Sequence, residues 1–178
     1  HILSPNHINF LVYKDTLIEE HISGIPGDTY ISEHLSEISE QDKRALAKEF
    51  VKFNERCFVR LLADMRSYNY VIVITHDFDR KQYRIRAVDF DQQSYEGNPK
   101  VYKPQFLKEN NDLVKLSLEV LAKESIEQYE KEERSLLAKR ATSEHERLHD
   151  LITCMKADQI SSKEKIKQLR TGLFDLTG

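Results

Sequence analysis

The sequence predicts an α+β fold in which helices dominate. Three observations carry this prediction: strand-like sequence near the N-terminus, a long amphipathic segment over residues 40–63, and two β-rich runs followed by a helical tail. Apolar residues that recur every three or four positions indicate a helix, whereas alternation of apolar and polar residues indicates a strand. We therefore expect an N-terminal strand pair, a long helix, a central β-hairpin and a helical tail, in that order.

The composition is that of one globular unit. The chain has 178 residues, of which 39% are hydrophobic and 32% charged, and its net charge is −3. A general electrostatic grip on phosphates needs a basic excess, so we expect no nucleic-acid partner. No apolar run reaches the roughly 18–20 residues that span a bilayer, and no signal peptide is recognisable. We therefore expect a cytoplasmic protein without a membrane partner, and we expect Cys57 and Cys154 to be reduced, buried thiols.

The first part of the chain predicts a hairpin, a turn and a short helix. Residues 8–13 and 16–22 are strand candidates, and Lys14 and Asp15 form the turn between them. The run from Ser23 to Asp28 holds two of the five glycines and predicts an irregular connection. A short helix over residues 29–35 is expected to follow.

The long amphipathic segment predicts a helix that begins after Ser39. Ser39 followed three residues later by Asp42 is typical of a capped helix start. Apolar residues then recur at three- and four-residue steps: Leu46, Phe50, Phe53, Cys57 and Leu61. We therefore expect one buried face along a helix of residues 40–63.

Two β-rich runs, residues 70–74 and 83–90, predict the central hairpin, with a loop over residues 76–82. In the second run Ile85, Ala87 and Asp89 share one face. Because a buried carboxylate is costly unless it is paired or bound to a metal, Asp89 is a candidate functional residue.

The remainder of the chain predicts a helical tail. Asn111 is a candidate cap for a helix that carries Leu113, Leu116 and residues as far as Ile126. Residues 127–134 form a charge run, which we interpret as a solvated helix face. Two further helix starts are expected at Ser143 and at Ser161–Ser162, with Gly172 as a C-terminal stop.

The residues between the long helix and the hairpin carry the functional hypothesis. Asp64 follows the helix, Asn69 opens the first strand, and Asp89 ends the second. An antiparallel pair brings Asn69 and Asp89 to the same end of the hairpin. One aspartate could accept a proton from a hydroxyl, while an amide and a carboxylate oxygen suit a magnesium ion. The simpler interpretations stay open: Asp64 and Asn69 as turn residues, and Asp89 in a salt bridge with a neighbouring arginine such as Arg66.

Asp64-Met65-Arg66-Ser67-Tyr68-Asn69, followed by Asp89-Phe90-Asp91, resembles the Asp-x-x-x-x-Asn and Asp-Phe-Gly motifs of the protein-kinase-like fold. The helical tail is more similar to small-molecule and atypical kinases, such as aminoglycoside and choline phosphotransferases. The resemblance implies a C-terminal lobe over residues 29–178, preceded by the end of an N-lobe and a hinge over residues 1–28. It implies ATP and Mg²⁺ as cofactors, Asp64 as base, Asn69 and Asp89 as magnesium ligands, and Glu20, His21 and Ile22 beside adenine.

The resemblance leaves two functions open. The first is that the parent protein is an ATP-dependent phosphotransferase that acts on a hydroxyl of an unknown substrate, in which case we expect this chain alone to be inactive. The second is a catalytically inactive kinase-like scaffold whose helical tail binds a protein partner. The second interpretation rests on Leu62-Ala63 before Asp64, on Asp91 in place of glycine, and on the lack of a glycine-rich phosphate loop in the sequence. Because the chain opens with His1 rather than methionine, we expect it to be part of a longer protein.

Overall fold

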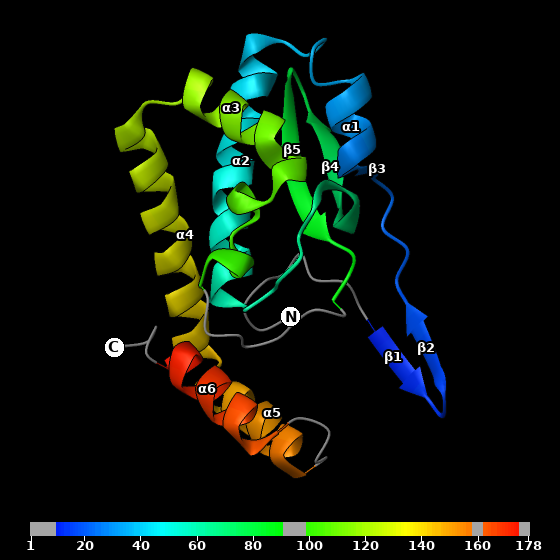
Figure 1. Ribbon diagram of the computed structural model, residues 1–178, viewed down its shortest axis with the longest axis vertical. Coiled ribbons are helices and arrows are strands. Elements are labelled where there is room, and N and C mark those ends of the chain that lie inside the picture. The colour runs from blue at the N-terminus through cyan, green and yellow to red at the C-terminus, as the bar shows by residue number, and fades with distance from the viewer. Residues whose placement is uncertain (1–9, 91–98, 158–161, 175–178) are drawn as a thin grey trace.

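The computed structural model describes residues 10–90, 99–157 and 162–174, and its architecture is α+β with helices in the majority (Figure 1). The strands are β1 (Phe10–Tyr13), β2 (Thr16–Glu19), β3 (Ile25–Pro26), β4 (Tyr70–Asp77) and β5 (Arg80–Ala87). The helices are α1 (Gly27–Glu33), α2 (Glu40–Val59), α3 (Asn111–Val120), α4 (Lys123–Ser143), α5 (His145–Ala157) and α6 (Lys163–Phe174). Short 3₁₀ turns join them: η1 (Ser67–Asn69), η2 (Pro99–Tyr102), η3 (Pro104–Phe106) and η4 (Lys108–Asn110).

The central hairpin is confirmed. Strands β3, β4 and β5 form an antiparallel sheet in that order, and the β4–β5 register runs from Tyr70 opposite Ala87 to Asp77 opposite Arg80. The connection is tighter than expected, because residues 78 and 79 alone form the turn. Strand β5 ends at Ala87, so Asp89 lies two residues beyond the strand that was expected to contain it. Tyr83, Ile85 and Ala87 are buried, as the alternation predicts.

Helix α2 supplies the core that covers the sheet. Its start is confirmed, because the Asp42 N–H donates to the Ser39 hydroxyl at 3.1 Å. Leu46, Phe50, Phe53 and Cys57 are buried against residues of the sheet. In Figure 1 helix α2 runs beside strand β5. The predicted apolar face therefore packs where it was expected.

Helix α2 ends at Val59, four residues earlier than predicted. Leu61 has a φ of 54°, which is the left-handed region. Its N–H donates to the Phe58 carbonyl at 3.2 Å, and the Leu62 N–H donates to the Cys57 carbonyl at 2.9 Å. These two bonds form a Schellman motif, which glycine usually signals in a sequence. Because residue 61 is leucine rather than glycine, the sequence did not indicate that the helix ends here.

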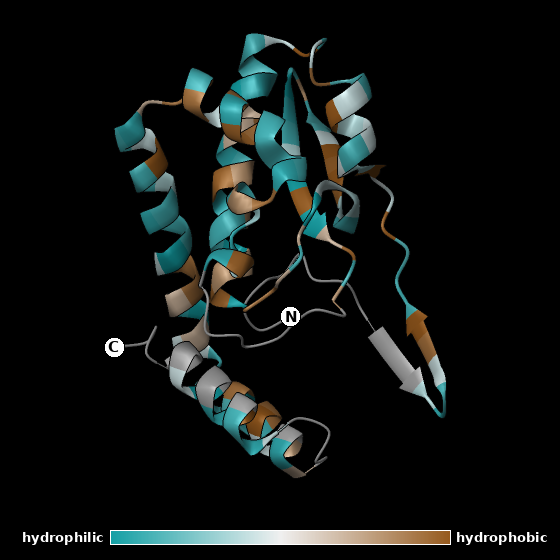
Figure 2. Ribbon diagram, viewed as in Figure 1, coloured by the Kyte–Doolittle hydropathy of each residue, from teal (hydrophilic) through white to brown (hydrophobic). Residues whose placement is uncertain are grey.

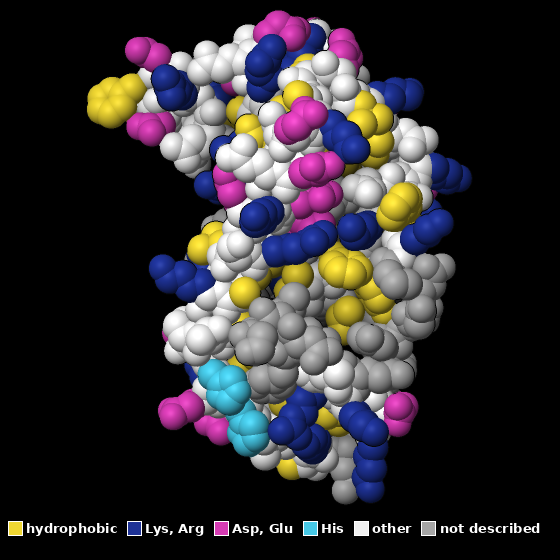
Figure 3. Space-filling view, turned by 90° about the vertical axis from the view of Figure 1, so that its left-hand side faces the viewer, with side chains coloured by type: hydrophobic (Ala, Val, Ile, Leu, Met, Phe, Trp, Pro, Cys, Tyr) yellow, Lys and Arg dark blue, Asp and Glu magenta, His cyan; other side chains and the backbone are white. Residues whose placement is uncertain are grey.

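The charge run of residues 127–134 is not only a solvated face. Helix α4 packs beside α2 and is mostly hydrophilic along its first half (Figure 2). Glu132 accepts a hydrogen bond from Lys52 at 3.1 Å, and Glu133 lies buried, 3.5 Å from Arg56. On the face that α4 occupies, basic and acidic side chains are intermixed (Figure 3). Ion pairs therefore contribute to the docking of α4 on α2.

The tail contains the expected helices with different boundaries. Asn111 is the first residue of α3 rather than its cap, and Ile126 belongs to α4. Ser143 is the last residue of α4 instead of the start of a helix, and its hydroxyl donates to the Arg140 carbonyl at 3.0 Å. Gly172 lies inside α6. None of the helices in the described ranges combines the length and apolar character that a membrane span requires.

The N-terminal strand pair is confirmed over residues 10–19, and β2 ends at Glu19 rather than residue 22. Figure 1 shows β1 and β2 standing apart from the central sheet. The following segment returns to that sheet, because Ile25 of β3 pairs with Ile72 of β4. Residues expected in the hinge region therefore include a strand of the central sheet.

Candidate functional site

The loop that follows α2 has a fixed backbone. Leu62 and Met65 are almost completely buried and anchor it in the core. Between them Asp64 has a φ of 56°, a left-handed conformation that aspartate tolerates better than most residues. The Asp64 side chain is 22% exposed, so its carboxylate reaches the surface while the backbone beneath it is held.

Asp64 and Asn69 lie together, as the sequence predicts for a shared site. The Asn69 side-chain amide donates to the Asp64 carbonyl at 2.7 Å and lies 3.4 Å from a carboxylate oxygen of the same residue. The Arg66 N–H also donates to the Asp64 carbonyl, at 2.8 Å. Because Asn69 is buried, its amide group is fixed by these contacts. Its Oδ1 atom accepts no hydrogen bond from any residue that the structure describes.

Arg66 pairs with Asp64, and not with Asp89 as one interpretation of the sequence proposed. Its guanidinium donates to Asp64 at 2.7 Å and to Glu109, in η4, at 2.8 Å. The hydrogen bond to Asp64 and the charges of Asp64 and Glu109 raise the pKa of Arg66, so it stays positively charged. The Asp64 carboxylate therefore faces a permanent cation.

Asn110 supports this loop from below and was missed by sequence reasoning. It is fully buried, and its amide donates to the Met65 and Pro104 carbonyls at 2.9 Å each. The Tyr70 hydroxyl donates to its Oδ1 at 2.8 Å. One side chain thus joins the loop before the hairpin, strand β4 and the η3 turn. The signal in the sequence was the polar run Glu109-Asn110-Asn111 ahead of an apolar helix, which we interpreted as a cap alone.

Asp89 lies at the same end of the hairpin as Asn69. The Val88 N–H donates to the Asn69 carbonyl at 3.0 Å, which extends the β4–β5 pairing by one residue. Asp89 is the next residue and is half-buried. The backbone therefore places Asp89 beside Asn69, as the predicted register required. Asp91 lies outside the described residues.

The expected adenine-binding residues lie between β2 and β3. Glu20 and His21 are exposed, whereas Ile22 is buried. Over the ranges that the structure describes, no group of three or more His, Cys, Asp or Glu side chains forms a metal-binding cluster. Comparisons with models of protein families, with curated proteins and with solved structures find no match to this chain.

Proposed function

We propose that the chain is the main lobe of a kinase-like, ATP-dependent phosphotransferase that acts on a hydroxyl group. The observation that carries this proposal is the hydrogen bond from the Asn69 amide to the Asp64 carbonyl. It supports a single site built from the loop after α2 and the open end of the β4–β5 hairpin. Phosphoryl transfer requires mainly positioning and charge stabilisation, and this rigid loop suits both tasks.

In this proposal Asp64 accepts the proton of the attacking hydroxyl. Its carboxylate is half-buried and reaches the surface, and Arg66 fixes its orientation. Glu20, His21 and Ile22 would lie beside adenine. This last assignment rests on the family resemblance and on their place ahead of β3 alone.

The oxygens at the open end of the hairpin fit magnesium. Because the Asn69 nitrogen is directed to Asp64, its Oδ1 is the atom that remains for a ligand. Asp89 adds a carboxylate beside it along the backbone. Carboxylate and amide oxygens are ligands that magnesium accepts, a few at a time. A bound magnesium ion would neutralise charge on the phosphates of ATP.

The second candidate function is an inactive kinase-like scaffold. The observation that favours it is the Arg66–Asp64 pair, because a carboxylate oxygen engaged at 2.7 Å by a guanidinium is not free to contact a substrate hydroxyl. In that case α3 to α6 would present the binding surface for a protein partner. The two functions differ in whether the chain binds Mg-ATP.

Thermal unfolding with and without Mg-ATP separates them, since a ligand that binds only the native state raises its stability. In a form of the protein that also includes the N-lobe, we expect Mg-ATP to raise the Tm, and Asp89→Asn to abolish the shift. Asp79→Asn, which changes an exposed carboxylate at the hairpin tip, is the matched control and should keep it. No shift in a form of the protein that also includes the N-lobe would favour the scaffold, whereas no shift in the 178-residue chain alone would not separate the two functions.

Phosphoryl transfer to a panel of hydroxyl compounds tests Asp64 itself. Asp64→Asn retains a side chain that tolerates the left-handed backbone, so the fold should persist. In a form of the protein that also includes the N-lobe, we expect turnover to fall by about 10²–10⁴-fold, the usual contribution of a general base. Full turnover in this variant would contradict the assignment of the base.

A further inference from the structure

A basic groove lies between α2 and the outer half of β5, far from the candidate site. Its volume is about 490 Å³, and its basic lining residues are Lys48, Lys52, Arg80, Lys81 and Arg84. The acidic ones are Glu49 and Asp77. Five cations against two carboxylates are a local basic excess in a chain whose net charge is −3. The groove therefore favours an anionic ligand.

Two of these five cations are available to a ligand, because Lys52 pairs with Glu132, Lys81 with Asp42 and Arg84 with Glu49. Within the described part of the chain, Lys48 and Arg80 have no carboxylate at ion-pair distance, and Lys48 instead lies over the Tyr129 ring at 4.8 Å. Lys81 is 3.7 Å from Asp42, a long contact in which the Lys81 side chain is 42% exposed and that of Asp42 13%. Such surface pairs contribute little, so an incoming anion can compete for these cations.

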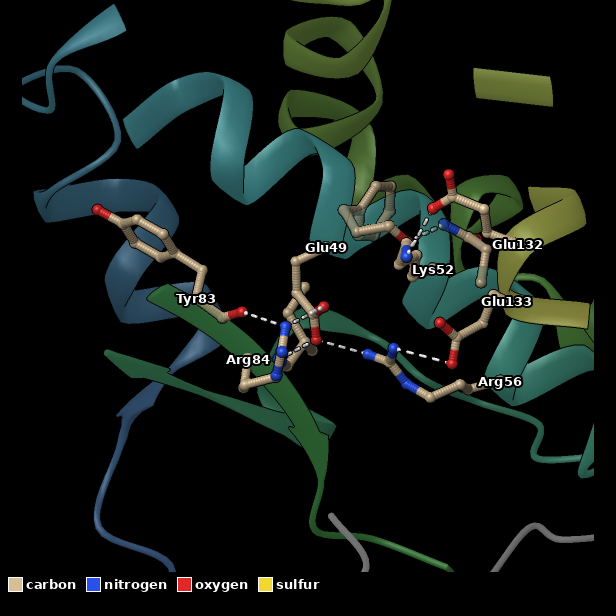
Figure 4. A network of polar contacts seen from close by, with 10 residues as sticks. Glu49, Lys52, Arg56, Tyr83, Arg84, Glu132 and Glu133 are labelled. Carbon is tan, nitrogen blue, oxygen red and sulfur yellow. Dashed lines mark hydrogen bonds and ion pairs between the residues drawn. The ribbon is translucent and has the colours of Figure 1, made fainter. Parts of the chain in front are cut away.

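The negative charge of Glu49 does not oppose such a ligand. Figure 4 shows its carboxylate between Arg84 of β5 and Arg56 of α2, at 3.3 Å and 2.6 Å. The same carboxylate accepts the Ile85 N–H at 2.9 Å. Glu49 is thus neutralised by two guanidinium groups, and it covers the inner part of the free edge of β5.

In the outer part of that edge Lys81 is exposed, whereas Tyr83 is almost completely buried. The Val88 N–H donates to β4 and the Ile85 N–H to Glu49, so even-numbered amides of this strand face β4 and odd-numbered ones face the groove. The amides of Lys81 and Tyr83 therefore point into the groove, and no described residue accepts a hydrogen bond from either. A free strand edge is a template for pairing with another extended segment.

We propose that this groove binds an acidic peptide segment of a partner protein, which adds to β5 as a further strand. The backbone of the segment would pair with the Lys81 and Tyr83 amides, and its carboxylates would meet Lys48 and Arg80. In such complexes the backbone bonds supply affinity and the side-chain pockets supply specificity. The groove is separate from the candidate catalytic site, because its lining extends along β5 only as far as Arg84, opposite Val73, whereas the candidate site lies beyond Tyr70 and Ala87.

The hairpin tip, which borders the groove, is better suited to contact with a protein segment than with a membrane. Phe78 at the tip is fully exposed and has a φ of 50°, a strained conformation for an aromatic residue. Asp77 and Asp79 flank it, and two carboxylates oppose insertion among anionic lipids. Nucleic acid would need a basic surface much larger than one groove of an acidic protein.

Fluorescence anisotropy with the 178-residue chain tests this proposal. The probe is a labelled peptide of alternating glutamate and valine, and the control is a peptide of alternating lysine and valine. We expect saturable binding of the glutamate peptide alone. The double change Lys48→Glu and Arg80→Glu should weaken it by about tenfold or more, and the matched reversal of exposed Lys139 and Lys156 should not.

The strand pairing has its own test. Lys81→Pro removes an amide that faces the groove, whereas Lys81→Gln keeps that amide and removes only the charge. The proline variant should lose more affinity than the glutamine variant. Because proline could disturb the hairpin, amide hydrogen exchange in the unmodified chain is a second measurement. Peptide binding should slow exchange of the Lys81 and Tyr83 amides. The Gln82 and Arg84 amides face β4, so they should exchange slowly even without the peptide.

Three results would overturn the proposal. The first is the absence of binding to the glutamate peptide. The second is binding that is unaffected by the Lys48 and Arg80 reversals, or that leaves exchange at Lys81 and Tyr83 unchanged. The third is tighter binding of duplex DNA or of phosphatidylserine vesicles with the same dependence on Lys48 and Arg80, which would assign the groove to a different class of partner.

Discussion

The side-chain amide of Asn69 donates to the backbone carbonyl of Asp64 at 2.7 Å and so closes the loop between α2 and β4. The bond crosses five residues and satisfies a carbonyl that also receives the Arg66 N–H. It makes the conformation of Asp64 depend on a residue at the start of the strand. Asp64 and Asn69 therefore stabilise the loop and are also candidate functional residues.

Asn69→Asp should destabilise the protein by about 2 kcal/mol at neutral pH, because a carboxylate would face the Asp64 carbonyl and carboxylate without a donor. Burial and the negative neighbour raise the pKa of the introduced carboxyl in the folded state. Its protonated form can donate, so the deficit should shrink as pH falls towards about 4 and grow as pH rises through the folded-state pKa. Urea unfolding at several pH values measures this.

Asn111→Asp is the matched control for that experiment. Asn111 is exposed in the first turn of α3, where a negative charge interacts favourably with the helix dipole. Its stability should be unchanged or slightly higher at neutral pH. An Asn69→Asp variant with the same pH profile as this control would show that the amide bond to Asp64 contributes nothing.

Gly27→Ala should cost about 2–3 kcal/mol, because its Cβ would overlap the Tyr70 ring and lie 2.5 Å from the Ser67 carbonyl oxygen. The absence of a Cβ at residue 27 lets α1 pack closely against η1, which belongs to the loop of the candidate site. Gly24→Ala is the matched variant, since its Cβ would lie 3.1 Å from the Val71 side chain, and it should cost no more than about 1 kcal/mol. Equal midpoints in thermal unfolding would contradict this close approach.

Arg56→Leu should destabilise the protein by about 3 kcal/mol or more. Arg56 is buried between Glu49 and Glu133, so its removal leaves two buried carboxylates without their common cation. Lys52→Leu removes a neighbouring cation of α2 whose partner Glu132 is 42% exposed, and it should cost at most about 1 kcal/mol. Denaturant unfolding of both variants measures the difference, and similar losses would argue against a special role for the buried pair.

Local patterns predicted the parts of the fold that depend on near neighbours. Ser39 with Asp42 marked the start of α2, and the alternation around Ile85 marked the hairpin. The end of α2 was not predictable in the same way, since Leu61 adopts the conformation in which glycine is usual. The same limit applies to the candidate site. Asp64 and Asn69 are close in sequence and were predicted to be together, whereas the contacts of Asn110 join three segments that no local pattern relates.

The stability of the protein should fall at alkaline pH, beginning at about pH 9. Burial raises the pKa of Cys57 from 9.0 to about 12, and burial also raises the pKa of Tyr70 above its usual 10.0. Both acids are neutral when protonated, so the stability from holding their protons is complete below their unfolded pKa values. It is lost as pH rises towards the folded values, at about 1.4 kcal/mol per pH unit for each group that ionises only in the unfolded state.

Cysteine variants separate the contribution of Cys57 from that of the tyrosine. Between about pH 9 and 10, Cys57→Ala should flatten the decline in the free energy of unfolding, because Tyr70 ionises only above this range in the unfolded chain. Cys154→Ala should keep the decline, since Cys154 is exposed and was wrongly expected to be buried. Thiol labelling of the native protein should accordingly modify Cys154 and leave Cys57 protected until unfolding. Rapid labelling of both thiols, or an identical slope in both variants, would mean that burial does not hold the Cys57 proton.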